Sequence, residues 1–510
     1  MEPTSGRAPS LGLSLLPVAV LVALLAASVA LFGDGSSAGP NQIALILAAG
    51  VGILIGVRLG YPWAVLEQGI VHGISLSLGA ILILLTVGSL VGTWILAGIV
   101  PTMIYYGLEL LSPAVFYPSA CIICSLVSLA TGSSWTTAGT VGVALIGIAV
   151  AQDLNTGLAA GAVISGAYFG DKMSPLSDTT NLAPAMAGTD LFTHIRHMVW
   201  TTAPSITLAI LLFGIVGLTS APPRDTSSLA AILTALGGTF QLGPHLLIPV
   251  LLVLVLVVKK MPAFPALLLG SLVGALFAVI FQRDAVLAYA NAPDLPQWAA
   301  LVKGSWMALF DGYKLSSGNT ALDELLSRGG MSSMLSTVWL ILSAMMFGAV
   351  METTGMLQRI AASILGMVSG TGSLIAATLA TSFGMNIVAS DQYIAIVLPG
   401  RMFRAEYQRR HLHPKNLSRA LEDAGTLTSS LVPWNTCGAF MSQTLGVATF
   451  AYAPFAFFNL INPLVSLAYG FTGFTIEKLP EPAEGSQPPA AAASASPALS
   501  EVEGAAEPPR

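Results

Sequence analysis

The sequence predicts an all-helical membrane protein that crosses the bilayer about 10 to 13 times, because apolar runs close to spanning length recur along it. Of the 510 residues, 54% are hydrophobic and only 9% are charged, whereas soluble domains carry about 25% charged residues. The mean hydropathy is +0.78. The sequence contains no basic patch that would indicate a nucleic-acid partner. The partner that this composition requires is the lipid bilayer.

Apolar runs in the first half predict its membrane helices. They lie at 11–32, 43–57, 74–100, 157–170 and 199–218. The run 11–32 is longer than the apolar core of a signal peptide, so we expect it to be a membrane helix. We expect a first arm and helix at 1–40 and a first transport repeat at 41–225.

Two shorter apolar runs, 114–130 and 138–150, flank a segment rich in hydroxyl groups at 131–137. Both runs are at or below the length that spans a bilayer. We therefore predict a re-entrant hairpin or a discontinuous helix with Thr136 and Thr137 at its tip. The alternative is two short helices joined by a polar surface turn.

The second half repeats this alternation of apolar runs and polar breaks. An amphipathic linker is predicted at 226–242, a second transport repeat at 243–475 and a disordered tail, rich in Pro, Ala, Glu and Ser, at 476–510. Within the repeat we expect helices at 246–258, 263–281, 335–351 and 448–474. Segment 401–419 carries six Lys or Arg residues against one acid, so we expect it on the cytoplasmic side.

The segment 165–184 places ionisable residues directly after apolar, small-residue sequence. Asp171, Lys172 and Asp178 occur there with hydroxyl and amide side chains, and ionisable groups at membrane depth are functional candidates by default. Pro175 and Pro184 each disfavour a continuous helix. A break would expose backbone carbonyls beside carboxylates, which suits hard cations. The alternative is a helix end followed by a polar loop, with Asp178 as an ordinary N-cap.

Two features recur at nearly constant separation along the chain. The triplet 130–132 resembles 380–382, each placed at the tip of an interrupted apolar run, 250 residues apart. Asp171 with its following proline and Asn181 resembles Asp423 with Pro433 and Asn435, at a separation of 252 for the acids. Paired interrupted helices of this kind are typical of secondary transporters built from two repeated halves.

Three motifs resemble a known family. The stretch 165–183, SGAYFGDKMSPLSDTTNLA, is similar to the signature of the NhaC family of Na⁺/H⁺ antiporters. The blocks VGTW at 91–94 and ATGSSW at 130–135, and WNT at 434–436, resemble further family motifs. The resemblance covers roughly 40–475. It implies inverted repeats, a bacterial inner membrane location, Na⁺ and H⁺ as transported ions, and neither enzymatic activity nor a cofactor.

Antiport needs a carboxylate that binds either a proton or Na⁺, and removal from water helps protons to compete for it. Asp178 is our first candidate, with Thr179, Asn181 and backbone carbonyls as neutral oxygen ligands. Asp171 is the second, unless it pairs with Lys172. The supporting candidates are Ser177, Thr136, Thr137, Asp391, Asp423 and Asn435.

Two rival functions stay open at this point. One is an antiporter of the same family that moves organic acids or other small solutes with Na⁺ or H⁺, for which Lys172 is the basic residue nearest the central motif. The other is an intramembrane aspartyl protease, suggested by the Gly-Asp pair at 170–171. Position 168 is Tyr rather than the Gly that such a protease carries. The composition is compatible with a monomer and with a homo-oligomer.

Overall fold

The computed structural model describes residues 7–32, 36, 39–219, 226–315, 323 and 326–479. Within these residues the chain is helical, with two isolated β-bridges and no strand. The predicted tail lies outside the described residues from 480 onward. The predicted amphipathic linker 226–242 contains α12, Thr226–Thr239. The side chains of this helix up to residue 231 also lie outside the described part of the chain.

The helices of the first half are α1 Leu11–Phe32, α2 Pro40–Arg58, α3 Trp63–Leu76, α4 Leu78–Leu96, α5 Ile99–Leu110, α6 Phe116–Thr131, α7 Ser134–Thr137, α8 Val143–Ala151, α9 Thr156–Met173, α10 Asp178–Ala187 and α11 Leu191–Thr219. Those that follow α12 are α13 Ile248–Val258, α14 Ala263–Phe281, α15 Arg283–Ala290, α16 Gln297–Asp311, α18 Leu335–Thr353, α19 Met356–Leu365, α20 Thr371–Val388, α21 Gln392–Arg409, α22 Pro414–Leu421, α23 Thr436–Leu445, α24 Thr449–Tyr452 and α25 Phe457–Thr472. Two π-helical turns, Ala138–Gly142 and Glu422–Thr426, lie between α7 and α8 and after α22.

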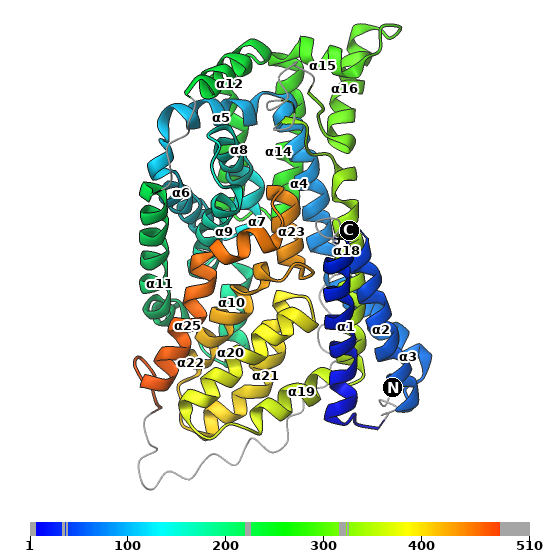
Figure 1. Cartoon of the computed structure of the whole chain (residues 1–510), viewed down its shortest axis with the longest axis vertical. Coiled ribbons are helices and arrows are strands. Elements are labelled where there is room, and N and C mark those ends of the chain that lie inside the picture. The colour runs from blue at the N-terminus through cyan, green and yellow to red at the C-terminus, as the bar shows by residue number, and fades with distance from the viewer. Residues whose placement is uncertain are drawn as a thin grey trace, which may run out of the picture.

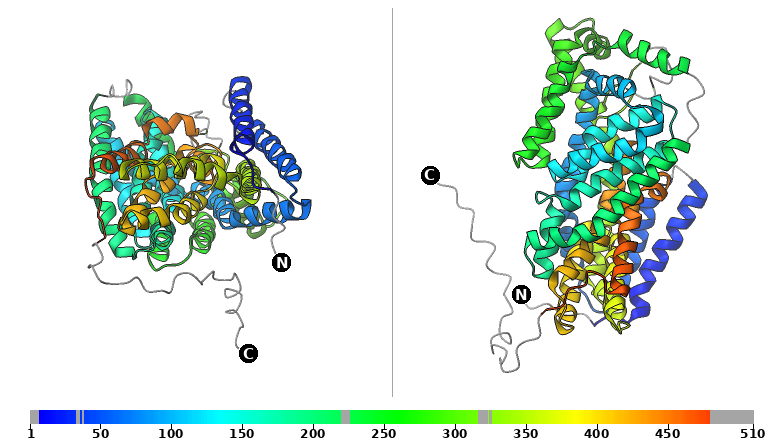
Figure 2. Two further views of the ribbon diagram at one scale, coloured as in Figure 1. Left: turned by 90° about the horizontal axis from the view of Figure 1, so that it is seen from below. Right: turned by 90° about the vertical axis from the view of Figure 1, so that its left-hand side faces the viewer.

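The described part of the chain contains nine helices long and apolar enough to cross a membrane, or up to eleven if two bent pairs each count as one span. The prediction of a polytopic helical membrane protein is therefore confirmed. Helices α5, α12, α15 and α16 lie at one end of the long axis, and α19 and α22 at the other (Figure 1). Helices α1 to α3 form a group at one side of the molecule (Figure 2), where α2 and α3 pack on α18.

The predicted long helix 74–100 is wrong, because the chain breaks twice there. Helix α3 ends at Leu76 and α4 starts at Leu78, and Gly98 adopts a φ of 75° between α4 and α5. A left-handed φ costs a glycine little, so this residue ends a helix in otherwise apolar sequence.

Two pairs of helices meet at tips in the interior. The α6–α7 connection contains Gly132 with a φ of 69°, and Ser133 caps α7. The α20–α21 connection contains Ser390 with a φ of 59°, and Asp391 caps α21. The alternative of a polar surface turn at 131–137 is wrong, since Thr131, Ser134, Thr136 and Thr137 are buried. The predicted tip at 380–382 is also wrong, because these residues lie inside the unbroken helix α20.

Matching structural features recur 257 or 258 residues apart. The left-handed glycines Gly98 and Gly355 precede α5 and α19. Helices α9 and α22 begin at Thr156 and Pro414, and α10 and α23 begin at Asp178 and Thr436. The separations of 250 and 252 inferred from sequence therefore differ from the spacing of these features by several residues. The two-repeat organisation itself stays a prediction, which this regular spacing supports.

Helix α9 packs closely along α6 because glycines face the contact. A Cβ atom added to Gly166 would lie 2.2 Å from the carbonyl oxygen of Cys121, and one added to Gly170 would lie 2.2 Å from the backbone nitrogen of Leu129. Small residues allow such close approach between membrane helices. The position of the C-terminal end of α9, which carries Asp171 and Lys172, therefore depends on these glycines.

The substitution Gly166→Ala should destabilise the protein, because the added methyl group forces α9 away from α6. We expect a loss of about 1–3 kcal/mol, the usual cost of overpacking, seen as a lower thermal unfolding midpoint in detergent. The matched control is Gly214→Ala in α11, where the added Cβ meets nothing within 4 Å. There alanine should be neutral or stabilise by up to about 1 kcal/mol. Equal midpoints for both variants would refute the packing argument.

Candidate functional site

The chain breaks between α9 and α10 at the position expected for Pro175. Ser174, the residue before the proline, is extended with a ψ of 129°, as steric contact with a following proline requires. The N-cap of α10 is Ser177, whose Oγ accepts a hydrogen bond from the backbone N–H of Thr180. Asp178 therefore occupies the first turn of α10 and is not its cap. The predicted break at Pro184 is wrong, because α10 continues through this proline.

Asp171 is buried at the end of α9, with 6% of its surface exposed. Its Oδ2 accepts a hydrogen bond of 2.6 Å from Ser134 Oγ, and its Oδ1 accepts one of 2.6 Å from Ser177 Oγ. Its backbone carbonyl accepts another from Thr180 Oγ1 at 2.8 Å. The tip of the α6–α7 pair and the start of α10 thus converge on one carboxylate through hydroxyl groups.

Lys172 forms a buried ion pair with Asp423. The Oδ1 atom of Asp423 also accepts a hydrogen bond from Thr201 Oγ1 of α11 at 3.1 Å, and Lys172 Nζ donates to Asn462 Oδ1 of α25 at 3.3 Å. The alternative pairing of Asp171 with Lys172 is wrong. Consecutive residues of a helix point about 100° apart, so the two side chains reach different neighbours.

Glu422 lies beside Asp423 in the π-helical turn and is fully buried. Among the residues that the structure describes, neither of its carboxylate oxygens has a hydrogen-bond partner of good geometry. Thr179 and Thr426 lie close to it, and Lys172 and Asp171 are within electrostatic range. Thr179 in turn shares a 3.1 Å hydrogen bond with Ser177. A chain of hydroxyl groups therefore connects the surroundings of Asp171 with those of Glu422.

The second break, before α23, is closed by amide side chains. Asn435 caps α23 by accepting from the backbone N–H of Cys437, and its Nδ2 donates to Asn386 of α20. The Oδ1 atom of Asp391 accepts from the backbone N–H groups of Tyr393 and Ile394 as the cap of α21. Asn435 and Asp391 are both buried. In each side chain at least one oxygen already accepts the hydrogen bond that caps a helix.

The remaining candidates lie at different depths. Asp178 and Asn181 are exposed at the surface of α10, and the Asn181 amide donates to the carbonyl oxygens of Pro175 and Ser177. Thr136 and Thr137 are buried, and their hydroxyl groups donate to Ser133. Of the sequence candidates, the structure brings Asp171, Ser177 and Thr179 together, with Asp423 nearby through Lys172.

Sequence reasoning missed three contributors to this site, Ser134, Glu422 and Thr201. Glu422 carried a usable signal, because it is an acid next to another acid in a stretch of small and hydroxyl residues. Ser134 also carried a signal, because it lies in the hydroxyl-rich segment 131–137. Thr201 carried none, since a hydroxyl group within an apolar run is common. Within the described residues, no group of three or more His, Cys, Asp or Glu side chains could hold a metal ion. An ion here would rely on hydroxyl and carbonyl oxygens as well as carboxylates.

A profile of the Na⁺/H⁺ antiporter family matches residues 166–474, which include both breaks and all the buried acids described above. The chain belongs to this family. Over 469 residues it is 38% identical to the Na⁺/H⁺ antiporter NhaC of Alkalihalophilus pseudofirmus, covering 92% of this chain and 97% of that protein. The resemblance inferred from the motif at 165–183 is therefore confirmed.

Other members of the family carry different names. The chain is 38% identical over 436 residues to a malate-2H⁺/Na⁺-lactate antiporter of Bacillus subtilis, covering 85% of this chain and 90% of that one. It is 35% identical over 475 residues to the arginine/ornithine antiporter ArcD of Halobacterium salinarum, covering 92% and 93%. These relatives are antiporters, and their names cover inorganic and organic substrates alike.

Removing one partner of the Lys172–Asp423 pair should destabilise the protein strongly. Lys172→Met leaves Asp423 buried without its cation, for which we expect a loss of about 3–5 kcal/mol. The double variant Lys172→Met/Asp423→Asn has no unpaired charge at this pair and should recover most of the loss. Thermal unfolding in detergent checks this cycle. If the double variant is no more stable than Lys172→Met, the loss of stability does not come from breaking the Lys172–Asp423 ion pair.

Proposed function

We propose that this protein is a secondary active transporter that exchanges Na⁺ for H⁺ across the cytoplasmic membrane of a bacterium. The observation that carries the proposal is the pair of buried carboxylates, Asp171 and Glu422, in a site lined by hydroxyl groups. Among the described residues neither forms an ion pair of its own. A buried carboxylate without a cation is costly, so it favours a bound proton or a bound cation.

Asp171 is the shared binding carboxylate in this proposal. Ser134 and Ser177 already orient oxygen atoms toward it, and Thr179 extends this shell toward Glu422. Na⁺ binding would rotate the serine hydroxyl hydrogens away, so that their oxygens become ligands. Proton binding would restore the hydrogen-bonded form. The two ions therefore compete for one carboxylate, which is the physical requirement for coupled exchange.

Lys172 has a structural task in this scheme. Because it pairs with Asp423, it fixes α9 against the π-helical turn that carries Glu422. An organic-acid carrier would require a cation available to the substrate, and Lys172, the basic residue on which that alternative depends, is already paired. This contact favours the inorganic ion over the organic acid. The hydroxyl partners of Asp171 likewise favour transport over a protease with paired aspartates.

We also propose that two transport halves, at about 41–225 and 243–475, approach each other at this site. Helices α7, α9 and α23 lie near the middle of the long axis (Figure 1), and substrate sites of secondary transporters lie near the bilayer midplane between repeats. The end with the basic segment 401–419 faces the cytoplasm in this arrangement.

The substitutions Asp171→Asn and Asp178→Asn separate the two leading carboxylate candidates. Asp171→Asn keeps the size of the side chain but removes the titrating group, so Na⁺-driven proton movement in proteoliposomes should fall at least 100-fold, roughly the scale of a lost essential charge. Asp178 is exposed, and Asp178→Asn should retain most of the exchange. Both proteins are compared at equal reconstituted amounts.

The opposite pattern, with exchange lost only in Asp178→Asn, would restore the sequence-based ranking and reject Asp171. Retained Na⁺ exchange in both variants would reject the proposed site. Proton movement driven by malate or lactate but not by Na⁺ would replace the inorganic ion with an organic acid as the substrate.

A further inference from the structure

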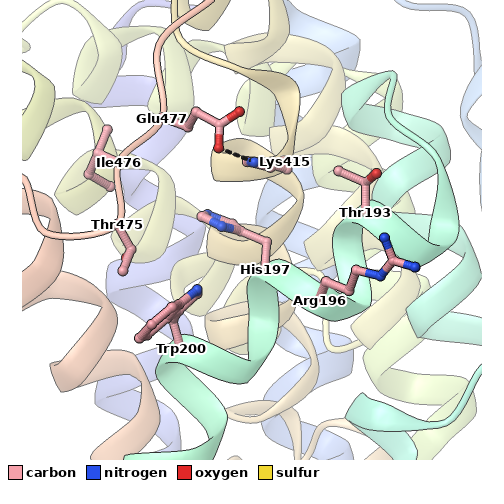
Figure 3. A pocket seen from close by; sticks show the side chains of 8 residues that line it. All are labelled: Thr193, Arg196, His197, Trp200, Lys415, Thr475, Ile476 and Glu477. Atoms are coloured by element: carbon pink, nitrogen blue, oxygen red, sulfur yellow. Dashed lines mark hydrogen bonds and ion pairs between the residues drawn. The ribbon is translucent and has the colours of Figure 1, made fainter.

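A cavity of about 530 Å³ lies away from the transport site, between the first turns of α11, the start of α22 and the segment 475–477. Figure 3 shows the side chains of Arg196, His197, Trp200, Lys415, Thr475 and Glu477 around it. The cavity lies toward the end of the molecule that carries α22 and the basic segment 401–419 (Figure 1).

Positive groups predominate around this cavity. Lys415 forms an ion pair with Glu477, whereas Arg196 is exposed and has no ion pair among the described residues. Arg419 does not line the cavity itself, but its Nη1 atom donates a hydrogen bond of 2.8 Å to Oγ1 of Thr475, a lining residue. The balance of charge therefore favours an anion, although the Glu477 carboxylate also faces the space.

His197 provides a second, independent indication of a ligand. It lines the cavity with only 6% of its surface exposed, and its Nε2 atom has no hydrogen-bond partner in the described part of the chain. Buried polar atoms in native proteins nearly always have a partner. The imidazole thus belongs to the cavity wall and leaves one buried ring nitrogen without a partner among the described residues.

The surface next to the cavity is apolar. Above it, α11 exposes Val199, Leu208, Leu211 and Ile215 along a helix apolar enough to span a membrane. Trp200, 53% exposed, makes an edge contact with Phe474 at a centroid distance of 6.0 Å. Exposed tryptophans of this kind mark the level of the headgroups. The cavity therefore opens where an apolar surface meets a basic one.

We propose that this cavity binds the phosphate of an anionic phospholipid, with Arg196 and Lys415 as charged donors and the free nitrogen of His197 as a third contact. Basic pockets between membrane helices bind lipid headgroups by this chemistry. The acyl chains would lie along the exposed face of α11. The site adds to the proposed exchange function and depends on it only for the cytoplasmic orientation.

The bound headgroup would join two helices that lead to the transport site. Helix α11 carries Thr201, which donates to Asp423, and α22 leads directly into the turn with Glu422 and Asp423. His194 Nδ1 and Ser418 Oγ already connect these helices at 2.8 Å. A phosphate held by both helices would restrict their separation, so anionic lipid should stabilise the folded protein.

The test measures the thermal unfolding midpoint of the purified full-length chain in neutral detergent during titration with phosphatidylglycerol, with phosphatidylcholine and with sodium phosphate. Phosphatidylglycerol should raise the midpoint in a saturable manner, and the other two should not at the same molar concentration. Arg196→Gln should weaken the phosphatidylglycerol response about tenfold in concentration, the effect of one charge-assisted contact. The matched control is Arg401→Gln, which removes an exposed charge from the same end outside the cavity.

Three outcomes would overturn the proposal. No stabilisation by phosphatidylglycerol would reject the site. Equal responses of Arg196→Gln and Arg401→Gln would show general charge attraction rather than a defined cavity. Stabilisation by sodium phosphate equal to that by phosphatidylglycerol would assign the cavity to a soluble anion and reject the lipid.

Discussion

The rest of the site depends on one constraint. Three carboxylates, those of Asp171, Glu422 and Asp423, are buried close together, and a single lysine pairs directly with only one of them. Lys172 neutralises Asp423, while Asp171 and Glu422 lie in the same buried region without an ion pair of their own among the described residues. Burying uncompensated charge costs several kcal/mol per ion. The site is therefore most stable when a proton or a small cation is bound, and this preference links its chemistry to exchange.

Helix breaks make this arrangement feasible at membrane depth. Each break directs hydroxyl or amide side chains toward backbone groups that would otherwise lack partners. Ser177 and Thr180 do so after α9. Before α23, Asn435 accepts from the backbone N–H of Cys437 and Asn386 donates to the carbonyl oxygen of Gly425. Irregular backbone is tolerated within a membrane where protein buries it. The close packing of α6 on α9 and the Lys172–Asp423 pair then hold the broken segments together.

The sequence predicted features with local causes and failed on those set by tertiary contacts. The break at Pro175 was predictable because a proline restricts its own neighbours. The partner of Lys172 was not, since Asp423 is 251 residues away and adjacent Asp171 is the nearer choice along the chain. Asp178 ranked first because it lies among oxygen-bearing side chains between the two prolines of the central motif, yet its position in the first turn of α10 leaves it exposed. The two-repeat organisation stays a prediction, and the helix starts and left-handed residues that recur are spaced differently from the acids.

The central claim is that one buried carboxylate site binds either Na⁺ or a proton. Proton release upon addition of Na⁺ to the purified protein in weakly buffered detergent solution tests this claim without vesicles or flux. The account predicts saturable acidification by NaCl, none by an equal concentration of choline chloride, and none by NaCl in the Asp171→Asn variant. Unchanged proton release in that variant, or no release in the unsubstituted protein at any pH at which it stays folded, would contradict it.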